Sequence, residues 1–207
     1  MDYQVNEIFT SVQGEGIWTG VSATFIRLQG CPVGCPWCDT KYTWAKGGFK
    51  MSVSEIVNRV TTKHVVVTGG EPTLWDLDKL FLSLMASNHY VQLETSGLSA
   101  LKGLVKPDWL TWSPKKNLSY HAPSCIRNAA KEVKWVVDTE LEWDTVWKSW
   151  KDLATRTVPP NFVLMPEGSP PSAENVAKAL DWLAKVPFSI QYNWRFGDRL
   201  QWRIGVR

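Results

Sequence analysis

The sequence predicts an α/β fold, a single-domain partial (β/α) barrel of mainly parallel strands over residues 1–207. First, short apolar strand segments alternate with segments of helical period, which favours right-handed crossovers and a mainly parallel sheet. Second, the chemically unusual motifs follow strand segments at their carboxyl ends, where α/β folds gather ligand-binding loops. Third, 44% hydrophobic and 21% charged residues are typical of a globular domain.

Each element is predicted from its local pattern. Strands are expected at residues 23–28, 64–68, 91–94, 110–113, 133–137, 162–165 and 188–191. Helices are expected at about residues 52–62, from Pro72 to Asn88, at about 139–154 and at 172–185. Two S/T-x-x-E capping boxes, Ser52 with Glu55 and Thr139 with Glu142, are predicted to begin the first and third helices.

Charge and hydropathy exclude several classes of protein. A net charge of +3 is too small to indicate nucleic acid or a membrane as partner. No segment approaches the roughly 18 apolar residues of a membrane span, and the first residues resemble no signal peptide. We therefore expect a cytoplasmic protein. Of the 13 tryptophans, Trp143, Trp147 and Trp150 repeat at helical period, which we interpret as core packing or a dimer surface.

Three of the four cysteines lie within eight residues, as Cys31, Cys35 and Cys38 in the spacing C-x3-C-x2-C. Thiols this close indicate a metal centre, and a structural zinc site would need a fourth ligand from a second pair. A four-iron cluster bound by three thiolates would leave one iron open to a substrate or cofactor. Trp37 adds a flat apolar face suited to a nucleobase. Cys125 is remote and is expected to be a bystander.

The cysteine triad, followed by Gly69-Gly70-Glu71-Pro72 after a strand, resembles the radical S-adenosylmethionine (SAM) superfamily. Nearly the whole chain is similar to the 7-carboxy-7-deazaguanine synthase family. The segments that carry this resemblance are 7–9, 13–16, 25–31, 38–40, 68–72, 94–97, 113–115 and 164–168.

This resemblance implies a radical ring contraction of 6-carboxy-5,6,7,8-tetrahydropterin to 7-carboxy-7-deazaguanine with loss of ammonia, a step toward queuosine and other deazapurines. It implies a [4Fe-4S] cluster, SAM and Mg²⁺ as cofactors. In this scheme the reduced cluster splits SAM, the resulting 5′-deoxyadenosyl radical takes hydrogen from the substrate's C6, and SAM is regenerated. A homodimer and an external electron donor such as a flavodoxin are further expectations.

The resemblance also implies roles for particular residues. The cluster ligands would be Cys31, Cys35 and Cys38, and SAM would contact Trp37, Asp39, Gly69, Gly70, Glu71, Gly97, Ser113, Lys115, Met165, Pro166, Glu167 and Gly168. The substrate would contact Val12, Gln13, Gly14, Glu15, Arg27, Thr95 and Gln201. A pterin presents a guanidine-like edge that needs acceptors and a carboxylate that needs cationic donors, for which Arg27 is suited.

Two sites have alternative interpretations. The resemblance implies that Thr40 binds Mg²⁺, but capping of the helix after the cluster loop, residues 31–38, would by itself justify either Asp39 or Thr40. Asp39 is expected to be a cap or to lie behind the metal. In the C-terminal extension, about residues 188–207, Arg199-Leu200-Gln201 resembles an Arg-Leu-His segment in one branch of the family. Gln201 could hydrogen-bond but not titrate.

Two other functions compete with this one. A glycyl-radical activase would share the cofactors, but the Gln13–Gly16 segment and the Asp39-Thr40 pair favour the pterin enzyme. An RNA-binding module is suggested by the interleaved residues Trp194, Arg195, Arg199, Trp202, Arg203 and Arg207. The intervening Asp198 and the modest net charge weaken that hypothesis.

Overall fold

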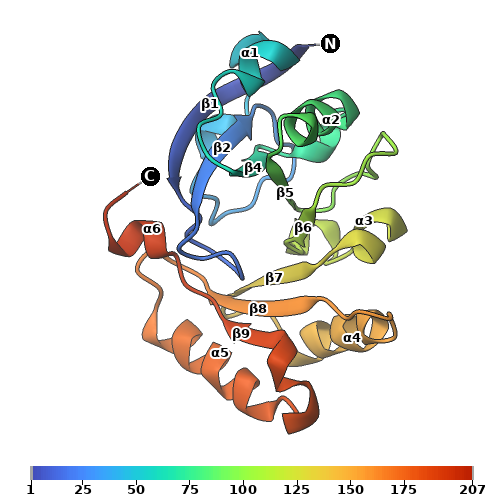
Figure 1. Ribbon diagram of the computed structural model, residues 1–207. Helices are drawn as coiled ribbons and strands as arrows, with labels where there is room; N and C mark the ends of the chain where they lie inside the picture. The colour runs from blue at the N-terminus through green and yellow to red at the C-terminus, as the bar shows by residue number, and fades with distance from the viewer. Residues whose placement is uncertain (1, 207) are drawn as a thin grey trace.

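A single curved sheet organises the computed structural model, which describes residues 2–206 (Figure 1). Its strand order is β3-β1-β2-β4-β5-β6-β7-β8-β9. The strands are β1 (Asp2–Val12), β2 (Ser22–Leu28), β3 (Phe49–Ser52), β4 (His64–Gly69), β5 (Tyr90–Thr95), β6 (Trp109–Trp112), β7 (Glu132–Val137), β8 (Asn161–Pro166) and β9 (Trp194–Phe196). All pairs from β2 to β9 are parallel, whereas β1 is antiparallel to both of its neighbours. The predicted α/β partial barrel is therefore confirmed.

Helices lie along the outer, convex side of this sheet, as Figure 1 shows for α2 to α5. The α-helices are α1 (Val53–Val57), α2 (Asp78–Ala86), α3 (Ser124–Ala129), α4 (Trp143–Ala154), α5 (Ala173–Lys185) and α6 (Leu200–Arg203). Short 3-10 turns are η1 (Lys41–Thr43), η2 (Pro72–Leu74), η3 (Lys116–Leu118) and η4 (Phe188–Asn193). Among residues 2–206, no helix is both long enough and apolar enough to cross a membrane.

The core lies between the sheet and these outer helices. Leu80, Phe81 and Leu84 of α2 are fully buried, as the helical spacing predicts. The tryptophan stripe of α4 packs in the same way. Trp150 is buried, while the rings of Trp143 and Trp147 stack with centroids 5.4 Å apart. Trp143 and Trp147 are half-buried against the core, which confirms core packing, while the dimer surface stays a prediction.

The helix boundaries depart from prediction where local hydrogen bonds compete. The Ser52–Glu55 capping box is present, but α1 ends at Val57 rather than near residue 62. The Thr139–Glu142 capping box is wrong. The carboxylate of Asp138 instead accepts hydrogen bonds from the backbone N–H groups of Glu140 (3.0 Å) and Leu141 (2.8 Å), so the chain turns there and α4 begins at Trp143.

The strand predicted at residues 188–191 is also wrong, because that segment is the 3-10 turn η4. Pro187 precedes this turn, and Phe188 and Tyr192 are 86% and 83% exposed, so the apolar pattern there does not reflect burial. The last strand, β9, follows the turn and pairs with β8. Strands β1 and β3 and helices α3 and α6 lie outside the predicted elements.

The direction of β1 determines where the following loop lies. Val12, at the end of β1, pairs with Ser22, at the start of β2. The loop 13–21 therefore starts at the amino ends of the parallel strands, opposite the cluster loop. The ring of Trp18 packs there against His64, Tyr90 and Trp109, the first residues of β4, β5 and β6. The loop thus covers the barrel interior at the amino ends of the parallel strands.

Candidate active site

One cavity on the concave side of the sheet gathers most of the predicted site residues. It is lined by Cys31, Cys35, Trp37, Cys38, Asp39, Thr40, Gly69, Gly70, Glu71, Ser113, Lys115 and Met165 from the predicted cluster and SAM set. All seven predicted substrate residues line it too: Val12, Gln13, Gly14, Glu15, Arg27, Thr95 and Gln201. Gly97, Pro166, Glu167 and Gly168 are not among its lining residues.

The cluster loop leaves the end of β2 and is held by hydrogen bonds from two sides. Gly30 N–H donates to the Thr43 carbonyl at 2.8 Å, and the amide of Asn117 donates to the carbonyls of Val33 (2.8 Å) and Gly34 (3.2 Å). Its cysteines are free thiols. Burial raises the pKa of the Cys31 and Cys35 thiols, so both gain from a cation that would stabilise the thiolate.

The loop fits an iron–sulfur cluster better than a single metal ion. Within residues 2–206, no group of three or more His, Cys, Asp or Glu side chains is arranged around one ion position. In a four-iron cluster each thiolate binds its own iron, so the three sulfurs need only line one space, as they do here.

A glycine at position 70 allows the turn after β4 to approach the cluster loop. A Cβ at Gly70 would lie 2.1 Å from the Gly30 carbonyl oxygen, a backbone atom that cannot move away easily. The N–H groups of Gly70 and Glu71 donate to the carbonyls of Leu28 and Gly30, each at 2.8 Å. The predicted need for glycine here thus has a physical cause in the contact between the two loops.

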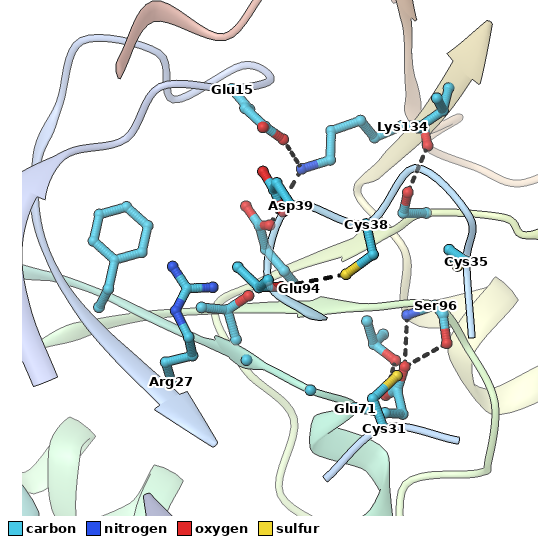
Figure 2. Close-up of a pocket in the computed structure, with 18 of the residues that line it drawn as sticks. Glu15, Arg27, Cys31, Cys35, Cys38, Asp39, Glu71, Glu94, Ser96 and Lys134 are labelled. Carbon is cyan, nitrogen blue, oxygen red and sulfur yellow. Dashed lines mark hydrogen bonds and ion pairs between the residues drawn. The ribbon is translucent and has the colours of Figure 1, made fainter. Parts of the chain in front are cut away.

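Glu71 is saturated by hydrogen-bond donors from the turn η2 and from the end of β5. Its Oε1 accepts from the N–H (3.0 Å) and hydroxyl (2.8 Å) of Thr73 and from the Thr95 hydroxyl (2.5 Å). Its Oε2 accepts from the Ser96 N–H at 2.9 Å and from the Ser96 hydroxyl (Figure 2). Glu71 therefore joins the turn after β4 to the end of β5, a role that the sequence did not indicate.

Lys115 combines burial with an aromatic contact. Its ammonium lies 4.8 Å from the centre of the Trp37 ring and donates to the Ser113 hydroxyl. Burial lowers the pKa of Lys115 to about 8, although the nearby Cys35 opposes this. Because Ser113 donates in turn to the Lys134 carbonyl (3.0 Å), the Ser113–Lys115 turn is fixed beside the cluster loop.

Gly97 supports the cavity without lining it. Its φ is +77°, and an added Cβ would lie 2.5 Å from the Ala122 Cβ and 2.9 Å from the Trp112 indole nitrogen. That indole donates to the Ser96 carbonyl at 3.0 Å. Pro166 and Gly168 line a neighbouring pocket, and Glu167 lines another beside Cys35 and Trp37.

The opposite side of the cavity carries polar groups suited to an organic ligand. Gln13 donates to Oε1 of Glu94 at 2.9 Å and accepts from the Glu15 N–H at 3.2 Å. Arg27 points into the same space (Figure 2), pairs with Glu7 at 2.8 Å and lies 5.5 Å from the ring centre of Phe9. Arg27 is therefore anchored in the cavity wall rather than paired at the surface.

Thr40 does not act as a cap. It occupies the N-cap position of η1, but no side-chain hydrogen bond caps that turn, so the cap expected from Asp39 or Thr40 is wrong. The Thr43 hydroxyl donates to the Thr40 carbonyl at 2.8 Å instead. The Thr40 hydroxyl lies in the cavity, 3.5 Å from the Cys38 sulfur, where it could contribute to a metal site.

The C-terminal segment reaches this cavity. Leu200 N–H donates to the Gly14 carbonyl at 2.9 Å, and the Gln201 amide donates to Oε1 of Glu15 at 3.3 Å. A Cβ at Gly14 would lie 1.5 Å from the Gln201 side-chain oxygen, which explains the glycine. That oxygen is buried and has no hydrogen-bond partner within the described chain, so it could accept from a ligand.

Sequence reasoning assigned no role to two charged members of the site, although Glu94 begins the family-like segment 94–97. Glu94 and Lys134 both line the cavity, and Lys134 pairs with Glu15 at 2.6 Å and with Glu94 at 3.2 Å. The sequence did carry a signal for Lys134, because it is the single lysine inside the apolar run Val133–Val137. A buried strand tolerates a lysine only if its charge is paired.

The RNA-binding surface expected from the C-terminal residues is not assembled. Trp194 is 4% exposed, Arg203 pairs with Asp198, and Arg199 faces Glu15 at 3.4 Å. Arg207 lies outside the described residues. The aromatic and cationic side chains are thus dispersed between the core, the cavity and the surface.

The fold and the cavity, with its three cysteines, are those of a radical SAM enzyme. The sequence model of the Radical SAM superfamily matches residues 25–113 of this chain. The chain belongs to the 7-carboxy-7-deazaguanine synthase family. It is 39% identical to the 7-carboxy-7-deazaguanine synthase of Synechocystis, with 100% of this chain and 95% of the relative covered.

Two further comparisons agree with this assignment. The 7-carboxy-7-deazaguanine synthase of Buchnera aphidicola is 40% identical over 161 residues, which cover 66% of this chain and 72% of the relative. The crystal structure of QueE from Escherichia coli superimposes with a TM-score of 0.80 at 32% identity, covering 97% of this chain and 95% of that one.

Proposed function

We propose that this chain catalyses the radical ring contraction of 6-carboxy-5,6,7,8-tetrahydropterin to 7-carboxy-7-deazaguanine, with loss of ammonia. The observation that carries the proposal is the meeting, in one cavity, of the cysteine triad with Arg27, the buried Gln13 and the half-buried Glu15. Membership of the 7-carboxy-7-deazaguanine synthase family supports this reaction over a glycyl-radical activase.

The cofactors are a [4Fe-4S] cluster, SAM and Mg²⁺. Together the cluster and SAM supply radical initiation by hydrogen abstraction. Cys31, Cys35 and Cys38 line the cavity and would hold the cluster, and three thiolates would leave one iron able to bind SAM. Apart from Asp39 and Gly97, the predicted SAM contacts fall into three groups: the turn after β4, the Ser113–Lys115 turn with Trp37, and the segment Met165–Gly168.

The residues around the turn after β4 would act on SAM by shape and by charge. Gly69 packs its backbone against the end of β2 at Leu28, and Gly70 packs against Gly30, just before the cluster loop, so neither places a side chain in the way. Glu71 fixes that turn through Thr95 and Ser96, so it would position acceptors for the SAM ammonium in addition to its own charge. Asp39 and Gly97 complete the proposed set, with Gly97 acting through Trp112.

The substrate would be oriented from both ends. Arg27 would bind its carboxylate, and a Mg²⁺ ion held by the Thr40 hydroxyl would bind the same group. Gln13, Glu15, Thr95 and Gln201 would receive the pterin's N–H edge, with backbone from Val12 and Gly14 beside them. The ring contraction has no net change in oxidation state, so what these residues must provide is orientation and the exclusion of water.

Several further properties belong to the same proposal. Residues 1–207 form one radical SAM domain, with about 188–207 as its C-terminal extension. The enzyme takes electrons from an external reductant, which we propose to be a flavodoxin-type protein, and acts as a cytoplasmic homodimer. Sedimentation equilibrium tests the dimer, and reduction of the enzyme by a purified flavodoxin with its reductase tests the donor.

The decisive experiment is anaerobic turnover. Reconstituted enzyme is mixed with the carboxytetrahydropterin, SAM, Mg²⁺ and dithionite, and the products are identified by mass. The expected products are 7-carboxy-7-deazaguanine and ammonia in equal amounts, with SAM not consumed in proportion. An enzyme that carries the full cluster and cleaves SAM, but leaves the pterin unchanged, would refute the substrate assignment.

A further inference from the structure

Lys134 occupies an unusual position for a lysine. It lies in the middle of β7, where all six residues are buried, and its side chain is only 7% exposed. Alternation along the strand turns Lys134 and Val136 toward the cavity and Val133 and Trp135 toward the outer helices. A lysine at such a site is tolerated only when its charge is paired.

Two carboxylates from opposite walls of the cavity meet this ammonium. The Nζ atom lies 2.6 Å from Oε2 of Glu15, on the loop after β1, and 3.2 Å from Oε2 of Glu94, in β5 (Figure 2). Lys134 thus joins the loop 13–21, called the substrate loop from here on, to the sheet through ion pairs. Glu15 lies 119 positions and Glu94 40 positions from Lys134 in the sequence, so the three side chains meet only in the folded barrel.

The remaining oxygen of each carboxylate is also held by donors. Oε1 of Glu94 accepts from Gln13 at 2.9 Å and from Gln92 at 3.3 Å. Oε1 of Glu15 accepts from Gln201 at 3.3 Å and lies 3.4 Å from Arg199. Both carboxylates are therefore held in one orientation, with Lys134 as their common partner.

The charges around Glu15 depend on this ammonium. Burial raises the pKa of Glu15, but Lys134 and then Arg199 lower it to about 2. Burial lowers the pKa of Lys134, while Glu15, Glu94 and Glu132 together raise it above its ordinary value. Glu15 is also faced by Lys115, and it shares the barrel interior with the carboxylates of Glu94 and Glu132.

We propose that Lys134 is a positioning residue that orients Glu15 and Glu94 as a pair of acceptors for the N–H edge of the pterin. The inference rests on the proposed function and adds a residue to it. Carboxylates are the strongest acceptors for that edge, because it presents two adjacent N–H donors in one plane and an ionised acceptor shortens and strengthens each hydrogen bond. Lys134 sets the spacing of the two carboxylates by bonding one oxygen of each.

The test measures binding of the product, 7-carboxy-7-deazaguanine, which retains this edge and needs no turnover. Dissociation constants are determined by calorimetry with cluster-loaded enzyme and SAM, between pH 6 and pH 8. The variants are Lys134→Gln, which removes the charge but keeps a donor, and Lys134→Arg, which keeps the charge. Lys148→Gln, at an exposed position in α4, is the matched control.

Lys134→Gln should weaken product binding about tenfold or more at pH 6, because a carboxylate of the pair then retains a proton and no longer accepts. Its binding should improve as the pH rises to 8. The parent and Lys148→Gln should bind the product with the same affinity as each other at every pH in this range. Lys134→Arg should recover most of the parent's affinity. Iron content should match the parent in every variant, because Lys134 has no predicted contact with the cluster.

The outcomes separate the inference from the function on which it rests. If the parent neither binds the product nor turns over the pterin, the proposed function fails. If the parent does both and Lys134→Gln binds the product as the parent does at every pH, the function stands and the role of Lys134 is refuted. A pH-independent loss in Lys134→Gln, not recovered by Lys134→Arg, would also refute it and indicate packing alone.

Discussion

The four cysteines have the same side chain but very different surroundings. Cys31, Cys35 and Cys38 line the cavity, and burial raises the pKa of the first two, so a thiolate there requires a nearby cation. Cys125 is exposed on α3. The surroundings rather than the thiol chemistry therefore determine which cysteines can hold iron.

Substituting a cluster ligand should remove the iron, whereas substituting the remote cysteine should not. Anaerobically reconstituted parent should contain about four iron and four sulfide per chain, and Cys35→Ala should lose most of both together with activity. Cys125→Ser is the control and should match the parent. Loss of iron in a folded Cys125→Ser variant, or stoichiometric zinc without sulfide in the freshly isolated parent, would contradict the assignment.

Thr40 allows the metal role to be tested with little interference from capping. Because its side chain makes no cap hydrogen bond, Thr40→Val should cost well under the roughly 1 kcal/mol of a lost cap. If the hydroxyl holds Mg²⁺, this variant should lose most of the Mg²⁺ stimulation of turnover and need about tenfold more pterin for half-saturation.

The control is Thr40→Ser, which keeps the hydroxyl and should keep the Mg²⁺ response. Turnover is measured against Mg²⁺ concentration at fixed iron content, and SAM binding is measured separately because it should not change. A Thr40→Val enzyme that responds to Mg²⁺ as the parent does would assign the hydroxyl no metal role.

The site residues and the contacts between them differ in how the sequence encodes them. Cys31, Gly70 and Glu71 belong to contiguous motifs, so a reader of the sequence finds them without knowing the fold. Glu94 and Lys134 acquire their partners only when β5, β7 and the loop after β1 meet, and no local pattern records that meeting. Local signals could show that Lys134 needs a partner but not which carboxylate provides it.

At the scale of elements, the loop after β1 depends on a buried acid at the start of β7. Glu132 is 1% exposed and accepts from the Ile17 N–H at 2.9 Å. A Cβ at Gly16 would lie 2.2 Å from Oε1 of Glu132, so the glycine allows this contact. Burial raises the pKa of Glu132 from 4.5 to about 7, although Lys134 opposes the shift.

This raised pKa gives a signed prediction for stability. The folded state binds an extra proton between pH 4.5 and about 7, so the stabilisation it provides is complete below pH 4.5 and is lost as the pH rises through 7. Glu132→Gln retains an oxygen for Ile17 but cannot lose a proton. Its unfolding free energy relative to the parent should therefore increase by up to about 3 kcal/mol from pH 4.5 to pH 7.5.

Denaturant unfolding of the two proteins at several pH values measures this difference. Glu140→Gln, a change at an exposed carboxylate that pairs with Lys116, is the control and should show no comparable trend. A relative stability of Glu132→Gln that is flat or falls with pH would mean that Glu132 is ionised in the folded protein at neutral pH.

Elements were predictable where one periodic pattern dominated. The helix α5 matches its prediction because Ser172 caps its start and its apolar face is buried against the sheet. The segment 188–191 failed because apolar residues there are exposed in η4, and alternation alone cannot distinguish exposed from buried apolar side chains. Strand β1 was missed because its polar residues interrupt the alternation, and its pairing with β2 and β3 compensates.

For the whole molecule, the alternation of strands and helices was sufficient to predict the partial barrel but not how its open side is closed. The sheet ends at β3 and β9, so β1 and β8 are not joined by strand pairing. Residues 197–201 bridge this opening. Gly197 N–H donates to the Leu164 carbonyl at 2.8 Å, and Leu200 N–H donates to the Gly14 carbonyl at 2.9 Å. Figure 1 shows the resulting position of α6 beside the N-terminal strands.

Arg199 is the charged residue of this bridge in the C-terminal tail, and its substitution should weaken the contribution of the tail to substrate binding. Its guanidinium donates to the Gly168 carbonyl at 2.9 Å and lies 3.4 Å from Oε1 of Glu15, so it connects the segment after β8 with the substrate loop. Arg199→Gln should raise the KM for the pterin about tenfold, because one partner of a largely buried charge pair is lost.

Arg203→Gln is the control in the same tail, because Arg203 is exposed and pairs with Asp198. The KM of this control should stay within about twofold of the parent. Steady-state turnover of both variants at matched iron content measures the difference. Equal KM values for the two variants would show that the tail closes the barrel through its backbone contacts and that the Arg199 charge adds nothing.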